Sequence, residues 1–338
     1  MLSAFRGKQR LQYEYNEAVP KVYLLETHSG IDEKTFFDTS RKEIAEIFTK
    51  AKLELHDDGT LLKLSVDNGD YYFDPYFFYY DARFAFRFIP VFTFAHSTNS
   101  DSCIRRLISG TSFFDGQWIL YEDLPKENMV AMESHFDGKY SENLSDLNVR
   151  FETRNARKRE EFLEHLKSNR YLGHLNSFKY YLNDESREHA FQAQYYYSGK
   201  VTLYGDGFED AMELIRRTTS SYASFLLKAE ENASELRGVY FVFNSQISEP
   251  RKVLENILDD TASKFVGFDI FETGSSCRTI VADLHVGGIV EIVITSNLLR
   301  ITIGQESCAN SIRRLAYLIM KNLDPYIQIE SLYGANYE

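Results

Sequence analysis

Side chains that bind metals occur along this 338-residue chain, but they do not fall into the spacings of known metal sites. The eight histidines form no HxH, HExxH or HxxxH pattern. Residues 56–58 (His-Asp-Asp) and 133–137 (Glu-x-His-x-Asp) combine histidine with carboxylates, which divalent metals accept as ligands. The first cluster lies at a predicted hairpin turn, where Asp is favoured for backbone reasons, and the second lies in a polar loop. We therefore predict no metal ion and no cofactor.

No nucleophile lies in a recognised catalytic motif. The sequence contains no GxSxG, no GxxxxGK[ST], and no GxGxxG after a strand. Cys103 begins a predicted helix beside Arg105 and Arg106, which would lower a thiol pKa, although a half-buried structural cysteine fits the same pattern. Asp269 and Glu272 lie three apart on a predicted strand and face opposite sides, which is wrong for a shared acid–base site. The sequence therefore favours a non-enzymatic protein and leaves open an enzyme whose site is assembled from distant residues.

Arginine and aromatic side chains form the clearest chemical pattern. Residues 71–94 are rich in Tyr and Phe, and residues 84–88 alternate Phe with Ala or Arg, which predicts a strand with one apolar face. An Ile-Arg-Arg-Leu sequence occurs at 104–107 and again at 312–315, with a partial copy at 215–217. We expect helices there that pack on one face and point two arginines outward.

Interleaved rings and guanidinium groups suit contact with other macromolecules. Aromatic residues and Arg are enriched at protein interfaces, and the same pair can stack single-stranded bases. A plain β core whose tyrosine hydroxyls reach solvent is the third explanation of the rings. A further basic run at 150–159 is interspersed with glutamates, as on a solvated helix face. The predicted interaction residues are Tyr79, Tyr80, Arg83, Arg87, Arg105, Arg106, Arg154, Arg157, Arg313 and Arg314.

The elements that must position these side chains are clearest in residues 238–323, which predict a strand, a helix, three strands and a helix. The runs 289–295 and 298–304 are β-branched and partly alternating, and Ser296-Asn297 suits the turn between them. Residues 307–322 carry apolar side chains at the i, i+3, i+4, i+7 spacing of a long amphipathic helix. We predict an α+β fold of antiparallel sheets covered by helices, with a C-terminal β-α-β-β-β-α unit.

Three consecutive regions are predicted along the chain. Residues 1–125 form an N-terminal α+β meander domain, and residues 126–235 form a mainly helical middle region with a Tyr-rich hairpin. Residues 236–338 form a C-terminal helix-on-sheet domain. We find no fixed repeat period.

Composition and charge describe an acidic globular protein. Hydrophobic residues make up 43% and charged residues 26%, which is ordinary for a soluble chain, and no run of 18 or more apolar residues predicts a membrane helix. The three widely spaced cysteines indicate neither a disulfide framework nor a zinc site, and no signal peptide is visible, so we expect a cytoplasmic protein. The net charge of −12 repels phosphate backbones, which disfavours a nucleic-acid partner without excluding a local basic patch.

Two short resemblances bear on the partner. The order of elements predicted for residues 238–323 resembles one half of the TATA-box-binding protein fold. Residues 114–116 (Phe-Asp-Gly), 120–121 (Leu-Tyr) and 124–125 (Leu-Pro) resemble a short stretch of the N domain of Argonaute proteins, without the catalytic carboxylate pattern of a PIWI domain. Either resemblance implies a nucleic-acid partner.

These observations predict a non-enzymatic cytoplasmic interaction or scaffold protein. It would be a subunit of a complex or a homo-oligomer that associates through an aromatic surface, with a protein or a second copy as its partner and no membrane. The first alternative is a nucleic-acid-binding module that uses Arg and aromatic surfaces. The second alternative is an enzyme whose site is assembled from residues distant in sequence.

Overall fold

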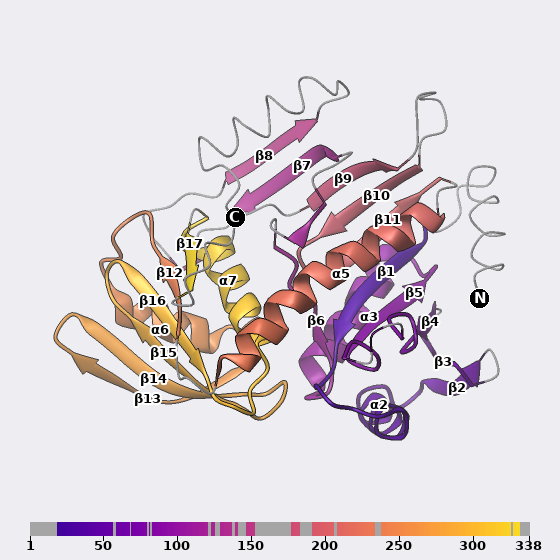
Figure 1. The fold of residues 1–338 in the computed structure, drawn as a ribbon, viewed down its shortest axis with the longest axis horizontal. Helices are drawn as coiled ribbons and strands as arrows, with labels where there is room; N and C mark the ends of the chain where they lie inside the picture. The colour runs from indigo at the N-terminus through magenta and orange to yellow at the C-terminus, as the bar shows by residue number, and fades with distance from the viewer. Residues whose placement is uncertain are drawn as a thin grey trace. The chain divides into compact units, whose positions relative to one another are not determined.

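The computed structural model divides the chain into two compact units (Figure 1). Unit 1 consists of residues 1–131 and 177–223, and unit 2 consists of residues 132–176 and 224–338. These units cut across the three consecutive regions expected from the sequence, which stay a prediction. The structure describes residues 19–56, 59–67, 69–79, 81, 83–120, 123–125, 129–136, 139–140, 147–152, 177–182, 191–205, 208–233, 238–325 and 327–331.

Unit 1 begins with a strand, a helix, four strands, a second helix and a short strand. The strands pair antiparallel in the order β2-β3-β4-β5-β1, and β6 pairs with β1. The elements are β1 (Lys21–Glu26), α2 (Glu33–Ile47), β2 (Lys52–His56), β3 (Leu61–Val66), β4 (Gly69–Phe73), β5 (Phe88–Thr93), α3 (Ser97–Gly110) and β6 (Asp115–Gly116).

Further strands and one long helix follow. β11 pairs with β1, β10 pairs with β11, and β9 pairs with β10, all antiparallel. Residues 208–223 of the helix belong to unit 1 and residues 224–231 belong to unit 2. These elements are β7 (Met129–Phe136), β8 (Leu147–Glu152), β9 (Ser177–Leu182), β10 (Phe191–Tyr196), β11 (Lys200–Tyr204) and α5 (Phe208–Glu231).

Unit 2 contains a second antiparallel sheet with two helices against it. Its strand order is β13-β14-β15-β16-β12-β17. The elements are β12 (Val239–Val242), α6 (Pro250–Asp259), the 3-10 helix η3 (Thr261–Ser263), β13 (Phe265–Thr273), β14 (Ser276–Asp283), β15 (Ile289–Ile294), β16 (Leu298–Ile303), α7 (Asn310–Asn322) and β17 (Gln328–Ser331).

The two units repeat one topology. Each runs strand, helix, four strands, helix, strand. In each, the four consecutive strands follow one another across the sheet, the last of them pairs with the first strand of the unit, and the final strand pairs with the other edge of that first strand. The sequence shows no repeat period, because a sheet constrains only the apolar or polar character of alternate positions and leaves residue identity free.

The sheet of unit 1 is covered on both faces. Every residue of β1 and β5 is buried. On one face, Tyr23 and Leu25 lie in a core with side chains of α2 and α3 such as Phe36 and Leu107. On the other face, Tyr222 of α5 packs edge-on against Phe88 of β5. A strand buried on both faces loses the alternation of apolar and polar residues that marks a half-exposed strand.

The predicted α+β class with antiparallel sheets and helices is confirmed. The C-terminal unit has four strands between its helices, one more than expected, and β17 follows the last helix. In the middle region the described residues are mostly strands together with α5, and the predicted helix in residues 157–168 lies outside the described residues. Among the described residues, no helix combines the length and apolar character needed to span a bilayer.

The predicted strand at residues 84–88 is wrong. This segment turns, Phe86 adopts a left-handed backbone conformation (φ 61°), and β5 begins only at Phe88. The Phe84 and Phe88 rings pack against each other, with centroids 5.5 Å apart, whereas Phe86 packs against Tyr76. The period-two spacing therefore reflects rings that enter separate parts of the core.

Gly199 occupies the tightest backbone crossing in unit 1. Its φ is +76°, and a Cβ there would lie 2.8 Å from the Leu24 carbonyl oxygen and 2.9 Å from that of Gln117. We expect Gly199→Ala to lower the free energy of unfolding by about 2–5 kcal/mol, since left-handed strain and a backbone clash add. Gly274→Ala is the matched control, because Gly274 has φ +62° with open space around it and adds only the strain, about 1–2 kcal/mol. Urea denaturation of both variants checks the order, and equal losses contradict it.

Candidate interaction surface

The two Ile-Arg-Arg-Leu sequences occupy equivalent helices of the repeat. The first lies in α3 and the second in α7, which follow the fourth consecutive strand in their units. In both helices the Ile and Leu are buried, namely Ile104 and Leu107 in α3 and Ile312 and Leu315 in α7. The similarity seen in the sequence therefore has a structural basis.

The second arginine of each sequence makes the same two contacts. Arg106 forms an ion pair with Asp67, which follows the second strand of the four, at 3.4 Å, and lies over the Phe48 ring. Arg314 forms an ion pair with Asp283, the last residue of the second strand, at 2.5 Å, and lies over the Phe265 ring. Phe48 lies between α2 and β2, and Phe265, the first residue of β13, follows α6 at a similar place in unit 2. The repeat thus keeps a guanidinium between a carboxylate and a ring.

The two arginine pairs differ in exposure, which corrects one prediction. Arg105 and Arg106 are exposed, as expected. The Arg314 side chain is fully buried, and Arg313 is 5% exposed with its guanidinium 3.8 Å from the Phe225 ring centroid. These two arginines do not form a surface, because the carboxylate and the rings around α7 hold them inside.

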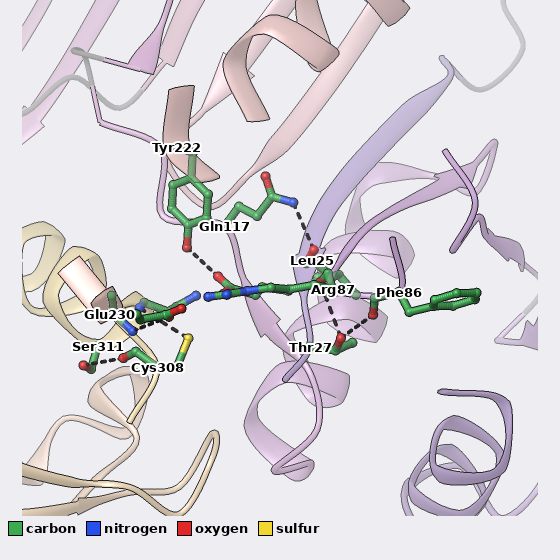
Figure 2. A network of polar contacts seen from close by, with 12 residues as sticks. Leu25, Thr27, Phe86, Arg87, Gln117, Tyr222, Glu230, Cys308 and Ser311 are labelled. Atoms are coloured by element: carbon green, nitrogen blue, oxygen red, sulfur yellow. Dashed lines mark hydrogen bonds and ion pairs between the residues drawn. The ribbon is translucent and has the colours of Figure 1, made fainter. Parts of the chain in front are cut away.

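A carboxylate from α5 caps the N-terminus of α7. Glu230 Oε1 accepts a hydrogen bond from the Ala309 amide at 3.0 Å, and Ser311 Oγ donates to the Cys308 carbonyl at 2.8 Å (Figure 2). Ala309 has no side chain that can cap the helix, so the carboxylate supplies the acceptor that the first amides require.

The predicted residues of the aromatic segment separate in the structure. Tyr79 is exposed, and Arg83 is exposed in an ion pair with Asp81 at 2.7 Å. Tyr80, Arg154 and Arg157 lie outside the described residues. Arg87 is not on the surface, because it is buried against the sheet of unit 1. Among the described residues of this set, Tyr79 and Arg83 are therefore exposed and Arg87 is not.

Arg87 belongs to a buried polar network that holds α5 on the sheet of unit 1. Its guanidinium donates to Glu26 Oε1 at 2.8 and 3.0 Å, and the Tyr222 hydroxyl donates to Glu26 Oε2 at 2.8 Å (Figure 2). Thr219 Oγ1 donates to the Gln117 side chain in the same region. A buried carboxylate is tolerated only when its oxygens are paired in this way. The network is complete within the protein, which favours a structural role.

A second buried network surrounds Lys21 on the helix side of the same sheet. Lys21 Nζ donates to the carbonyls of Val19 and Ala95 at 2.8 and 2.9 Å. Nearby, Tyr23 and Lys200 both donate to the Asp101 carboxylate. Burial and, to a smaller extent, the positive charge of Lys200 lower the pKa of Lys21 to about 8, and Asp101 acts in the opposite direction. Backbone carbonyls bind the ammonium on both sides, so the lysine is engaged in the fold.

The cysteine alternative raised by the sequence is not supported at Cys103. The thiol is buried, and burial raises its pKa to about 11, the opposite of what a reactive thiolate needs. A histidine–carboxylate metal site is also missing, since no group of three His, Cys, Asp or Glu side chains with metal-binding geometry occurs among the described residues. Asp57, Asp58 and Asp137 lie outside them.

The sheet of unit 2 carries the one surface on which large apolar side chains gather. In β13 and β14, buried residues such as Cys277, Thr279 and Val281 face the helices, and the residues between them face outward. We call this side, pointing away from α6 and α7, the outer face. Its large exposed apolar side chains are Val266 (49%), Phe268 (67%), Phe271 (59%), Ile280 (37%) and Ile289 (60%).

The strand register makes the outer face continuous. Val266 lies opposite Ala282, which lies opposite Ile289, so these side chains form a row across three strands. Phe271 lies opposite Arg278, in a second row that continues through β15 to β16. Directly opposed side chains in a sheet are about 5 Å apart and contact one another. The apolar residues therefore form one patch, and a β-bulge after Gly267 turns both Phe268 and Phe271 onto it.

A short ladder of charges crosses the patch. Glu291 Oε1 pairs with Arg278 at 2.5 Å, and Glu291 Oε2 pairs with Arg300 at 2.8 Å. The two arginines exceed the one glutamate, so the ladder carries one net positive charge. The sequence predicts strands at β13 and β15 but gives no role to this surface. The available signal was the run of apolar residues at outward positions such as Ile280 and Ile289, where a half-exposed sheet normally carries polar residues.

The paired arginines differ in their predicted effect on stability. Arg314→Met leaves the buried Asp283 carboxylate without its cation, so we expect a loss of about 3–5 kcal/mol of unfolding free energy. Arg106→Met is the matched control, because its ion pair with Asp67 is exposed, and it should cost about 1 kcal/mol or less. Chemical denaturation of both variants tests this, and losses of similar size would show that burial does not separate the two repeats.

The lowered pKa of Lys21 makes the free energy of unfolding depend on pH, and replacing Lys21 should remove this dependence. Between pH 8 and the ordinary lysine pKa of 10.5, the unfolded chain keeps a proton that folded Lys21 has lost. The contribution of Lys21 to stability therefore becomes more favourable as the pH rises through this window, by at most about 1.4 kcal/mol per pH unit. Unfolding free energies of the natural chain and Lys21→Met, measured at several pH values from 7 to 10, should diverge. Parallel curves would contradict the lowered pKa.

One of the comparisons with known proteins identifies a family for this chain. A family model described as MJECL33-like protein matches residues 5–336. No curated protein and no solved structure gives a match to the chain. The family description names no activity, substrate or partner. Because the match extends over nearly the whole sequence and both units, this chain belongs to the MJECL33-like protein family.

Proposed function

We propose that this protein is a non-enzymatic cytoplasmic interaction or scaffold protein that binds another polypeptide through the outer face of unit 2. The observation that carries the proposal is the patch of exposed apolar side chains on β13, β14 and β15, which includes Phe268, Phe271 and Ile289. Contiguous exposed apolar patches mark interaction surfaces, and buried aromatic side chains dominate binding energy at interfaces.

The charges on the outer face support a specific contact. Arg278 is 57% exposed and Arg300 is 36% exposed, so their guanidinium groups keep donors for a partner although both pair with Glu291. Arginine next to aromatic residues is the composition of binding hot spots. The three cysteines are free and buried, which agrees with the reducing cytoplasm expected from the sequence.

Site-specific photo-cross-linking tests the proposal. A benzophenone amino acid placed at Phe268 should form protein cross-links in cells that make the protein, because the ring would lie inside an interface. The same photo-reactive residue at Leu55, an exposed apolar position on β2 of unit 1, is the matched control. Cross-links at both positions or at neither would contradict the proposal, and light scattering of the purified chain shows whether a second copy is the partner.

A second candidate function is single-stranded nucleic-acid binding, and one observation favours it. Phe271, Arg278 and Arg300 lie in one row of the outer face, in which a ring adjoins two guanidinium groups. Exposed rings on a sheet stack bases, and arginines pair with the phosphates beside them. The net charge of −12 opposes this partner at long range.

Fluorescence anisotropy with a labelled single strand separates the two candidates. Nucleic-acid binding predicts an affinity that falls steeply between low and physiological salt. It also predicts a loss of about tenfold or more on Phe271→Ala, since stacking contributes about 1–3 kcal/mol for each base. Unchanged anisotropy at low salt would remove this candidate and leave the protein partner.

A further inference from the structure

The repeat allows the two sheets to be compared face by face. In β1 of unit 1, Tyr23 and Leu25 point into the core beneath α2 and α3. In β12, which holds the same place in unit 2, Val239 and Phe241 are the buried pair. The side of the unit 1 sheet that carries Glu26 therefore corresponds to the outer face of unit 2.

A helix covers that side in unit 1. The Tyr222 hydroxyl of α5 donates to Glu26 (Figure 2). The Tyr222 ring packs against Phe88. Earlier in α5, the Arg216 guanidinium lies 4.8 Å from the ring centroid of Phe77. The residues of α5 that are buried in unit 1 recur at helical spacing and are Phe208, Ala211, Met212, Leu214, Ile215, Thr218, Thr219, Tyr222 and Ala223.

The corresponding side of unit 2 also has apolar side chains to bury, but none of the described helices lies over it. β1 and β5 are buried at every residue, whereas the outward residues of β13, β14 and β15 include side chains that are half exposed or more. Phe268 and Ile289 expose 67% and 60% of their surface. Two copies of one topology thus differ in whether the second face of the sheet is covered.

We propose that the outer face of unit 2 binds an amphipathic α-helix from a partner protein, which takes the place that α5 holds on unit 1. This proposal rests on the proposed function, since it names the kind of partner for the same surface. The helix buries Phe268, Phe271 and Ile289 under an apolar stripe and places a carboxylate against Arg278 and Arg300, where the ladder has its extra positive charge. Helix-in-groove recognition by such a stripe is a recurrent mode of peptide binding.

The width of the sheet gives the length of a helix that crosses all six strands at a right angle. Six strands spaced about 4.8 Å apart make a sheet about 24 Å wide. A helix of about 16 residues spans the same 24 Å at a rise of about 1.5 Å per residue. Residues 208–223 of α5, the part that belongs to unit 1, have this length.

The chain's own described helices do not supply the occupant. Each of α2, α3, α5, α6 and α7 already buries the apolar side chains of one stripe or more. A second copy would have to withdraw one of these helices from its own core. Because every described helix is engaged in this way, we assign the outer face to a different protein with an unpaired amphipathic segment.

Selection from a peptide display library tests this inference on the full-length chain. The library consists of helical peptides of about 16 residues with a randomised stripe and a constant Ala, Glu and Lys outer side. We expect selected peptides to carry apolar residues at i, i+3, i+4 and i+7 with an acidic residue at the stripe edge, and to gain helical circular dichroism on binding. Phe268→Ser/Ile289→Ser should weaken binding at least tenfold, and Leu55→Ser should leave it unchanged.

The outcomes separate this inference from the function on which it rests. Extended peptides that depend on Phe268 and Ile289 would overturn the helix while preserving a protein-binding outer face. A dimer in light scattering that Phe268→Ser/Ile289→Ser abolishes would overturn the different-protein partner in the same way. Peptides that bind equally well to the face variant, or a library without binders, together with no cross-links from position 268, would remove both proposals.

Discussion

Burial of a sheet face under helices is the constraint on which this structure depends. An antiparallel sheet has two faces, and its backbone satisfies its own hydrogen bonds, so the fate of each face is decided by side chains and by what packs on them. In unit 1 both faces are buried, one under α2 and α3 and the other under the first part of α5. In unit 2 the helices α6 and α7 cover one face, and the other remains exposed and apolar. The contrast lies between two copies of one topology.

Both copies of the topology contain the same arginine interaction at their last helix. In α3, Arg106 contacts both Asp67 and the Phe48 ring. In α7, Arg314 contacts both Asp283 and the Phe265 ring. A planar guanidinium can pair with a carboxylate at its edge and stack on a ring at its face, which lysine cannot do as well. Unit 1 keeps this interaction at the surface and unit 2 buries it. Burial makes the ion pair of Arg314 a requirement of the core, since an unpaired Asp283 would remain in a medium of low dielectric constant.

The polar networks inside unit 1 engage several of its buried titratable side chains. Glu26, Arg87 and Tyr222 satisfy one another between the sheet and α5. Lys21 is bound by two backbone carbonyls, and burial lowers its pKa. A perturbed pKa indicates function when the group lies in a cleft that a substrate can enter. These groups are instead enclosed by their own partners, which indicates a structural role for them.

Local residue patterns determined the elements at the C-terminal end. Runs predicted at 289–295 and 298–304 became β15 (Ile289–Ile294) and β16 (Leu298–Ile303), and the amphipathic pattern at 307–322 became α7 (Asn310–Asn322). Period and turn chemistry are encoded within a few residues, so they can be recognised without the fold. Only the tertiary structure decided that Arg313 and Arg314 are buried, that the two units repeat, and that the outer face has no helix on it. Those properties depend on residues brought together from distant parts of the chain, such as Asp283 with Arg314 and Glu26 with Tyr222, which neighbouring sequence does not specify.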